Sequence, residues 1–96
     1  MLSLEICREL QNAEFPKPDN WRDRTFWKDK DEDVYMPSLE ELIEACGEKF
    51  GVLERFKSGH FGAYVPNDVG YNGIGDTPKE AVARLWLAIQ GADAEA

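Results

Sequence analysis

The stretch TPKEAVARLWLAIQG, residues 77–91, predicts the clearest helix of the chain. Thr77 and Glu80 have the T-x-x-E spacing of a capping box, and Pro78 occupies the first helical position, where its missing N–H is not needed. Gly91 is suited to the left-handed conformation that ends a helix. One face repeats at the i, i+3, i+4, i+7 spacing of an amphipathic helix and consists of Val82, Leu85, Trp86 and Ile89.

A second helix is predicted between Ser38 and Gly47, and a weaker one from Ser3 to Glu14. Ser38 and Glu41 have the S-x-x-E spacing of a capping box. The apolar face behind this box consists of Leu39, Leu42, Ile43 and Cys46. The N-terminal segment has a narrower apolar face and is stopped by two prolines at positions 16 and 18.

Between the second and third helices the apolar period becomes that of strands. Residues 51–56 and 60–65 flank a Ser58-Gly59 turn, which predicts an antiparallel hairpin. Residues 69–74 are expected to add an edge strand that glycine weakens. Nearer the N-terminus, residues 24–28 and 34–36 are expected as short extended pieces around the polar run 29–33, which we interpret as an exposed loop.

These elements predict an α+β fold in a single domain, residues 1–96. The expected order is helix, loop or short strand, helix, three strands, helix, with about three amphipathic helices packed on a small antiparallel sheet of about three strands. Leu85 and Trp86 are expected to pack across the sheet, while Trp21 and Trp27 close the edge of the core. The Ala-rich residues 91–96 are expected to form a frayed tail.

The composition argues against several classes of protein. A chain of 96 residues forms at most one domain, and 11% aromatic residues argue against disorder along the whole chain. A formal net charge of −8 disfavours direct binding of nucleic acid. No apolar stretch approaches the length of a membrane span, so we expect no membrane contact. Cys7 and Cys46 are expected to be reduced, buried thiols.

The acidic charge is concentrated in residues 29–48, which hold eight acids against a single lysine. This acidic face is the predicted partner-binding surface, because clustered like charge steers association with an oppositely charged surface. Its members are Asp29, Asp31, Glu32, Asp33, Glu40, Glu41, Glu44 and Glu48.

The same run contains a partial calcium-loop pattern. Asp29, Asp31 and Asp33 fall at positions 1, 3 and 5 of an EF-hand loop, and Glu40 falls at position 12. Position 6, which requires glycine, is Val34, and no good helix precedes the loop. A solvated acidic face is therefore favoured, with calcium binding kept as an alternative function.

No catalytic or metal-binding arrangement stands out, so we predict no enzyme, no metal site and no cofactor. His60 is the only histidine, and Cys46 lies on an apolar helix face beside acids that raise a thiol pKa. The glycines of residues 70–75 have the order G-x-x-G-x-G and lack the lysine of a phosphate loop. An enzymatic role would require a deep pocket at His60, Tyr64 or Asp76.

Two stretches resemble the signature helices of small phage and prophage proteins of the phage ABA-sandwich type. They are residues 36–47, MPSLEELIEACG, and residues 75–89, GDTPKEAVARLWLAI. The N-terminal CRELQNAEFP, residues 7–16, is similar to the opening helix of that family, in which glycine is usual at the place of Glu14. The resemblance implies helices on either side of a small sheet and a phage or prophage origin, but no established reaction.

A shorter resemblance is to HicB-type antitoxins, in which a strand leads through Gly-Asp-Thr into a helix that begins Glu-Ala. Gly75-Asp76-Thr77 and Glu80-Ala81 have this pattern. An acidic body would suit the masking of a small basic toxin. Much of the similarity is capping chemistry, which many α+β domains share.

The favoured hypothesis is a non-enzymatic phage- or prophage-encoded accessory protein, cytoplasmic in a bacterial host cell. It is expected to bind a partner protein with a basic surface, in one version to inhibit a host defence or nucleic-acid enzyme. A HicB-like antitoxin is the alternative. The oligomeric state is not predicted.

Overall fold

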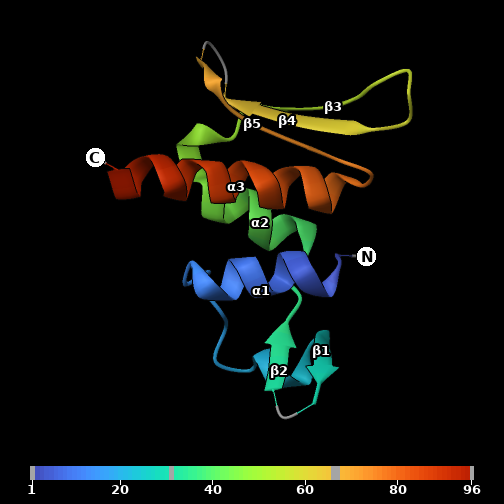
Figure 1. Ribbon diagram of the computed structural model, residues 1–96, viewed down its shortest axis with the longest axis vertical. Helices are drawn as coiled ribbons and strands as arrows, with labels where there is room; N and C mark the ends of the chain where they lie inside the picture. The colour runs from blue at the N-terminus through green and yellow to red at the C-terminus, as the bar shows by residue number, and fades with distance from the viewer. Residues whose placement is uncertain (1, 31, 66–67, 96) are drawn as a thin grey trace.

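The computed structural model describes residues 2–30, 32–65 and 68–95, without the side chains of residues 29, 48, 68–71 and 92–95 (Figure 1). The predicted α+β fold is confirmed, and its order agrees with the predicted one once the N-terminal extended pieces are counted as strands. The elements are α1 (Leu4–Asn12), β1 (Phe26–Asp29), β2 (Glu32–Tyr35), α2 (Leu39–Cys46), β3 (Val52–Arg55), β4 (Phe61–Val65), β5 (Asp68–Gly75) and α3 (Pro78–Glu95). Short 3₁₀ turns span Trp21–Asp23 and Gly47–Lys49.

The two sheets lie at opposite ends of the molecule, which measures 41 × 34 × 19 Å (Figure 1). One is the antiparallel sheet β3-β4-β5, and the other is the hairpin β1-β2. Helix α3 packs on β4 and β5, α2 packs on α3, and α1 packs on both α3 and β2. The helices therefore form the middle of the molecule and connect the two sheets.

Glycine in β5 lets the backbone of α3 approach the sheet closely. A Cβ built at Gly73 would collide with the backbone of Ala81 and Leu85, and one at Gly75 would collide with the Glu80 side chain. Gly73 pairs with Ala63 of β4, which is also fully buried. Small residues on this face thus set the distance between sheet and helix.

The predicted helix starts are confirmed by their hydrogen bonds. In the Ser38 capping box, Ser38 Oγ accepts from the Glu41 N–H at 3.2 Å while the Glu41 carboxylate accepts from the Ser38 N–H at 3.2 Å. Thr77 Oγ1 accepts from the Glu80 N–H at 3.2 Å. The predicted end of the last helix is wrong, because α3 runs through Gly91 to Glu95.

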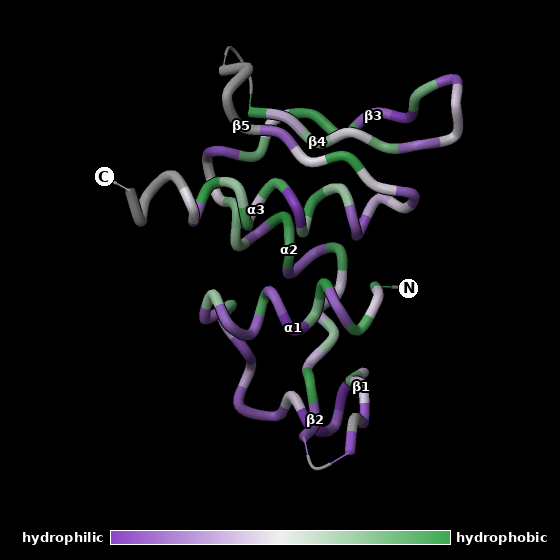
Figure 2. The backbone as a smooth tube through the Cα atoms, viewed as in Figure 1, coloured by the Kyte–Doolittle hydropathy of each residue, from purple (hydrophilic) through white to green (hydrophobic). Residues whose placement is uncertain are grey.

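The prediction of an exposed loop at residues 29–33 is also wrong for its described residues at either end, because Asp29 is the last residue of β1 and Glu32 and Asp33 are the first residues of β2. Lys28 pairs with Asp33, and Asp29 with Glu32. The hairpin is attached to the core by Val34 and Tyr35, which are buried, and by Trp27, which packs against the core, and it is otherwise largely hydrophilic (Figure 2). The polar run favours a loop locally. Burial of side chains in β2 and the pairing of β1 with β2 along the whole register override this preference.

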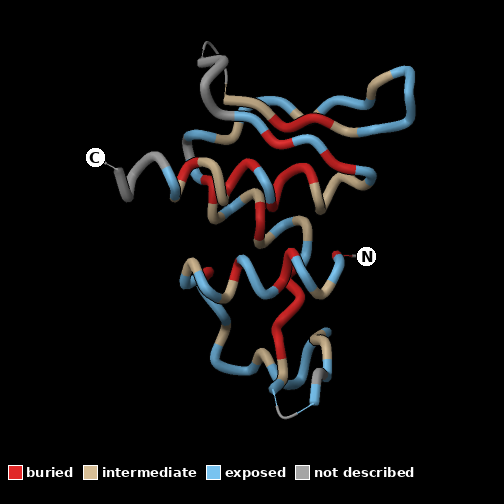
Figure 3. The backbone as a smooth tube through the Cα atoms, viewed as in Figure 1, coloured by how far each residue is buried: buried red, intermediate tan, exposed pale blue. Residues whose placement is uncertain are grey.

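The core runs along α3 and continues into α1 and the end of β2 (Figure 3). Leu85 is fully buried, and the buried Trp86 contacts Phe15 with ring centroids 5.0 Å apart. This ring therefore joins α3 to the segment after α1, a contact that the sequence did not predict. Cys7 and Cys46 are free and buried, as predicted.

The described helices all lie on one side of the β3-β4-β5 sheet (Figure 1). The outer face of this sheet exposes Val52 by 43% and Ile74 by 47%. This arrangement differs from the helices on either side of a sheet that the phage-family resemblance implies. Within the described residues, no helix combines the length and the apolar character that crossing a membrane requires.

Candidate functional site

The predicted acidic face is divided between the hairpin and α2, which α1 separates in Figure 1. Glu32 and Asp33 lie on β2, and Glu40, Glu41 and Glu44 lie on α2. Asp31 and the side chains of Asp29 and Glu48 lie outside the described residues. The structure thus does not bring the described acids together on a single surface.

The hairpin acids are bound to other parts of the chain. Glu32 Oε1 accepts from the Gln11 amide Nε2 at 2.6 Å, and Asp33 Oδ2 contacts the Arg22 guanidinium at 2.7 Å. These contacts attach the hairpin to α1 and to the turn before β1. They leave these two carboxylates less available to a partner, because a new contact must compete with an existing one.

Glu41 is the centre of a hydrogen-bonded group at the start of α2. Its Oε1 accepts from the Tyr35 hydroxyl at 2.5 Å and from the Ser38 N–H, and lies 3.6 Å from Arg24 Nη1. Its Oε2 makes no hydrogen bond to a described residue. The hydrogen bonds to Oε1 therefore hold the carboxylate in one orientation and leave Oε2 open to a further partner.

These contacts change the acidity of both partners. Burial raises the pKa of Tyr35 to about 12, and the hydrogen bond to Glu41 and its negative charge act in the same direction. For Glu41, burial alone raises the pKa, but hydrogen bonds from Tyr35 and Ser38 and the charge of Arg24 outweigh it. The net pKa of Glu41 lies below its usual 4.5, so this side chain is ionised at neutral pH.

Glu40 and Glu44 have a different environment. Both are exposed, and neither forms an ion pair with the part of the chain that the structure describes. They lie four residues apart and so share one side of α2. Among the predicted acids with described side chains, these two are the ones free to meet a partner.

A groove of about 400 Å³ separates α2 from the segment that follows α1. Its lining combines carboxylates with apolar and proline side chains: Phe15, Pro16, Lys17, Pro18, Glu41, Glu44 and Ala45. In the sequence the two prolines indicate only where a helix stops. The apolar Phe15, which lies between α1 and these prolines and is buried against Trp86, is the residue that could have indicated the groove.

A second hollow of about 370 Å³ adjoins the groove. Its lining shares two residues with the groove and consists of Cys7, Leu10, Gln11, Glu14, Phe15, Lys17, Tyr35 and Pro37. The ammonium of Lys17 lies 4.7 Å from the Trp21 ring centroid in a cation–π contact. The positive charge of Lys17 therefore interacts with the Trp21 ring beside the two hollows.

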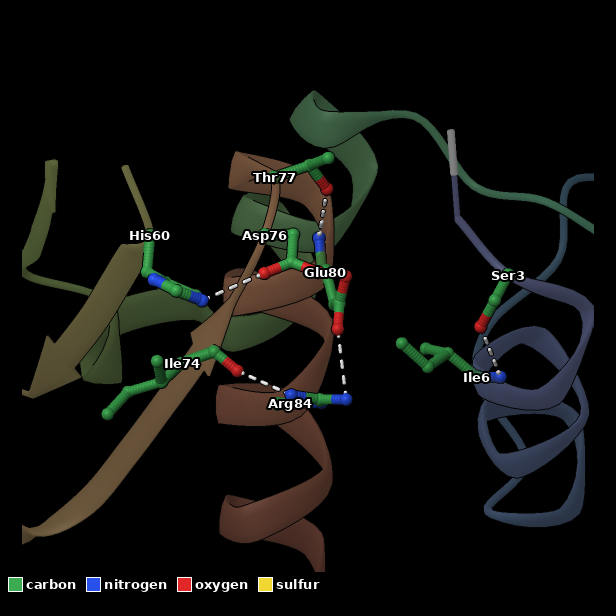
Figure 4. Close-up of polar contacts among 8 residues, drawn as sticks. All are labelled: Ser3, Ile6, His60, Ile74, Asp76, Thr77, Glu80 and Arg84. Atoms are coloured by element: carbon green, nitrogen blue, oxygen red, sulfur yellow. Dashed lines mark hydrogen bonds and ion pairs between the residues drawn. The ribbon is translucent and has the colours of Figure 1, made fainter. Parts of the chain in front are cut away.

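His60 takes part in a hydrogen-bonded chain that has the composition of a catalytic triad. Its Nδ1 lies 3.0 Å from Ser58 Oγ. Its Nε2 lies 3.1 Å from Oδ1 of Asp76, just before α3 (Figure 4). The His60 and Asp76 side chains are 51% and 77% exposed, however. Water competes for every one of these contacts, and neither hollow described above includes them, so they do not form a water-excluding site.

The edge of β5 beside this chain is covered by α3. Arg84 Nη1 donates to the Ile74 carbonyl at 2.7 Å, and its Nη2 contacts Glu80 Oε1 at 2.9 Å (Figure 4). A covered carbonyl is a poorer template for pairing with another strand. The polar groups of Arg84, Glu80 and Ile74 at this end of the molecule are therefore paired with one another, whereas Glu44 in the groove is not paired with a described residue.

The calcium-loop pattern does not form an EF-hand loop, because Asp29 and Asp33 lie on opposite strands of the hairpin and Glu40 lies on α2. In the described residues, no three His, Cys, Asp or Glu side chains gather as a metal site.

Comparison of the chain with models of protein families, with curated proteins and with solved structures finds no match.

Proposed function

We propose that this protein acts as a binding module that contacts a partner protein of basic surface through the acidic side of α2. The observation that carries the proposal is the contrast among the acids. Glu32, Asp33 and Glu41 have partners within the chain, whereas Glu40 and Glu44 are exposed and have none among the described residues. The interaction surface is therefore narrower than the eight residues that the sequence indicates.

The net charge of −8 supports the same function. A molecule of this charge attracts a basic surface over a distance of about 10 Å at moderate salt, and unpaired acids lose no internal contact when they bind. The resemblance to phage proteins extends the proposal to an accessory protein of a phage or prophage. Its partner is then a host defence or nucleic-acid enzyme, whose basic channel the acids occupy.

The test is capture of partners from a bacterial lysate at low and at high salt. The variant Glu40→Gln with Glu44→Gln is compared with Glu5→Gln and Glu9→Gln, which removes two exposed charges at the same spacing and the same helical positions on α1. We expect the first variant to lose the partner and the control to retain it. Equal retention by both variants would show that α2 is not the binding surface.

A second candidate function is that of a HicB-like antitoxin. The observation in its favour is that β5 ends at Gly75 and leads through Asp76 and the capping Thr77 directly into α3. This is the strand-to-helix unit on which the resemblance rests. We expect a small basic protein encoded beside the gene to arrest growth when expressed alone and not when expressed with this chain. Growth arrest that persists in coexpression would exclude this candidate.

A further inference from the structure

We propose that the groove between α2 and residues 15–18 receives one arginine side chain of the partner, with its guanidinium at Glu44 and at Oε2 of Glu41, the one oxygen of that carboxylate that its partners within the chain leave open. This inference rests on the proposed function and names the chemical group that the acidic surface recognises. The occupant is a cation because the groove presents two carboxylates beside apolar walls.

The two carboxylates are arranged for a forked cation. Glu41 and Glu44 lie three residues apart on α2, so they are neighbours on the same side of the helix. The Glu41 Oε1 is held by Tyr35 and by the Ser38 N–H and lies 3.6 Å from Arg24 Nη1, while its Oε2 makes no hydrogen bond to a described residue. A carboxylate held in this way binds a guanidinium with little loss of conformational freedom.

The apolar lining of the groove suits the methylene stem and the planar guanidinium of an arginine side chain. Phe15, Pro16, Pro18 and Ala45 line the groove together with the acids. Arginine lays its methylene stem along apolar surface and its planar guanidinium against flat groups, whereas the ammonium of lysine is a compact, strongly hydrated charge. The groove therefore favours arginine over lysine.

The one cation in the lining does not oppose this occupant directly. The ammonium of Lys17 lies 4.7 Å from the centroid of the Trp21 ring, and the guanidinium carbon of Arg22 lies 4.5 Å from the same centroid. Lys17 thus lines the groove while its charge has a partner outside it. The volume of about 400 Å³ falls in the range of ligand sites, so a single side chain enters without rearrangement of the walls.

The first experiment is an NMR titration of the ¹⁵N-labelled chain with N-acetylarginine methylamide. N-acetylcitrulline methylamide, which has the same shape without the charge, and N-acetyllysine methylamide serve as controls. We expect amide shifts confined to Phe15, Lys17, Glu44 and Ala45, strongest with the arginine probe and absent with citrulline. Shifts that appear equally at Glu5 and Glu9, or that citrulline reproduces, would overturn the proposal, as would no shift at all.

Two variants distinguish the groove from the wider acidic surface. Glu44→Gln is expected to weaken the arginine probe about threefold, the effect of one partly exposed ion pair. Ala45→Leu narrows the groove without changing the charge and is expected to abolish the shifts, with its thermal unfolding as the check that it is folded. A folded Ala45→Leu protein that still binds the arginine probe at full strength contradicts the groove assignment.

The lysate experiment separates failure of this inference from failure of the proposed function. If the wild-type chain and Ala45→Leu retain the same partner but Glu40→Gln with Glu44→Gln does not, the groove inference is wrong and the proposed function stands. If the wild-type chain retains no partner, the proposed function is wrong, and the arginine titration still decides whether the groove binds this side chain.

Discussion

The C-terminal unit, β3-β4-β5 with α3, and the N-terminal part, α1 with the β1-β2 hairpin and α2, are stabilised in different ways. In the C-terminal unit, the backbone of α3 lies directly on Gly73. In the N-terminal part, side chains connect the elements through Tyr35 with Glu41, Gln11 with Glu32, and Arg22 with Asp33.

This difference determines where a binding surface can form. Backbone packed on backbone leaves no room for a ligand, and the edge of β5 is further covered by Arg84. Elements joined by side chains leave hollows between them, and both hollows described above lie in the N-terminal part.

The largest effect is expected from Gly73→Ala, because the new methyl group meets the backbone of α3. We expect a loss of about 3 kcal/mol in the free energy of unfolding, measured by urea denaturation. The matched control is Gly91→Ala, where a Cβ meets nothing within 4 Å and where helix propensity favours alanine by roughly 0.5–1 kcal/mol. A Gly73→Ala protein as stable as wild type would show that glycine does not set this packing.

The second prediction concerns alkaline pH and the buried thiols of the N-terminal part. Burial raises the pKa of Cys46 from 9.0 to about 11. A folded-state pKa above the unfolded one gives stability that is present below pH 9 and lost as the pH rises to about 11. We expect Cys46→Ala to remove about 2 kcal/mol of the loss between pH 9 and pH 11, measured by urea denaturation at several pH values. An unchanged alkaline slope would contradict burial as the cause.

The third prediction concerns the hydrogen bond between Tyr35 and Glu41. Tyr35→Phe is expected to lower the free energy of unfolding by about 1–2 kcal/mol at pH 7. Because the pKa of Glu41 is lowered on folding, its contribution is present above pH 4.5 and is lost as the pH falls through the folded value. The variant should therefore lose less stability than wild type on acidification.

The control for this prediction is Tyr64→Phe in the C-terminal sheet. The pKa of Tyr64 is also raised, through desolvation first and then through the charge of Glu54 and a hydrogen bond with it. Because Tyr64 does not join separate elements around a hollow, we expect a smaller change from this variant. If Tyr64→Phe lowered the free energy of unfolding as much as Tyr35→Phe or more, the hydroxyl that joins separate elements would not be the more important of the two.

The smallest effect is expected at the end of α1. Glu14 has φ +62°, and the Phe15 N–H donates to the Leu10 carbonyl at 2.9 Å, while the Glu14 N–H donates to Gln11, which together form a Schellman motif. Glu14→Gly is expected to stabilise the chain by about 0.5–1 kcal/mol, measured as a rise in melting temperature. Glu14→Ala, which removes the charge and keeps the strain, is the control, and equal stabilisation by both would exclude backbone strain as the reason.

The predictions from sequence succeeded where a structure depends on near neighbours. Ser38 with Glu41 and Thr77 with Glu80 start their helices through hydrogen bonds that span three residues. The strands at 51–56, 60–65 and 69–74 were found within two residues of β3, β4 and β5. For the β1-β2 hairpin, the extended pieces predicted at 24–28 and 34–36 overlap the two strands, but the polar residues Asp29, Glu32 and Asp33, which favour a loop locally, belong to the strands and pair across the register.

The candidate site was predicted in part. The sequence indicated that the acids of α2 lie on the surface, but not that Glu41 is bound by Tyr35 while Glu40 and Glu44 are not. The groove was not predicted, because its walls come from residues 15–18 and from α2, far apart along the chain.

By itself, the sequence determined the α+β class, the helix starts and the sign of the charge, because capping, periodicity and ionisation depend on residues close together or on composition alone. The tertiary structure decided which acids are free, that Trp86 meets Phe15, and that a groove lies beside Glu44. Those features require contacts between distant segments, whose pairing depends on the packing of the whole chain and not on any local pattern.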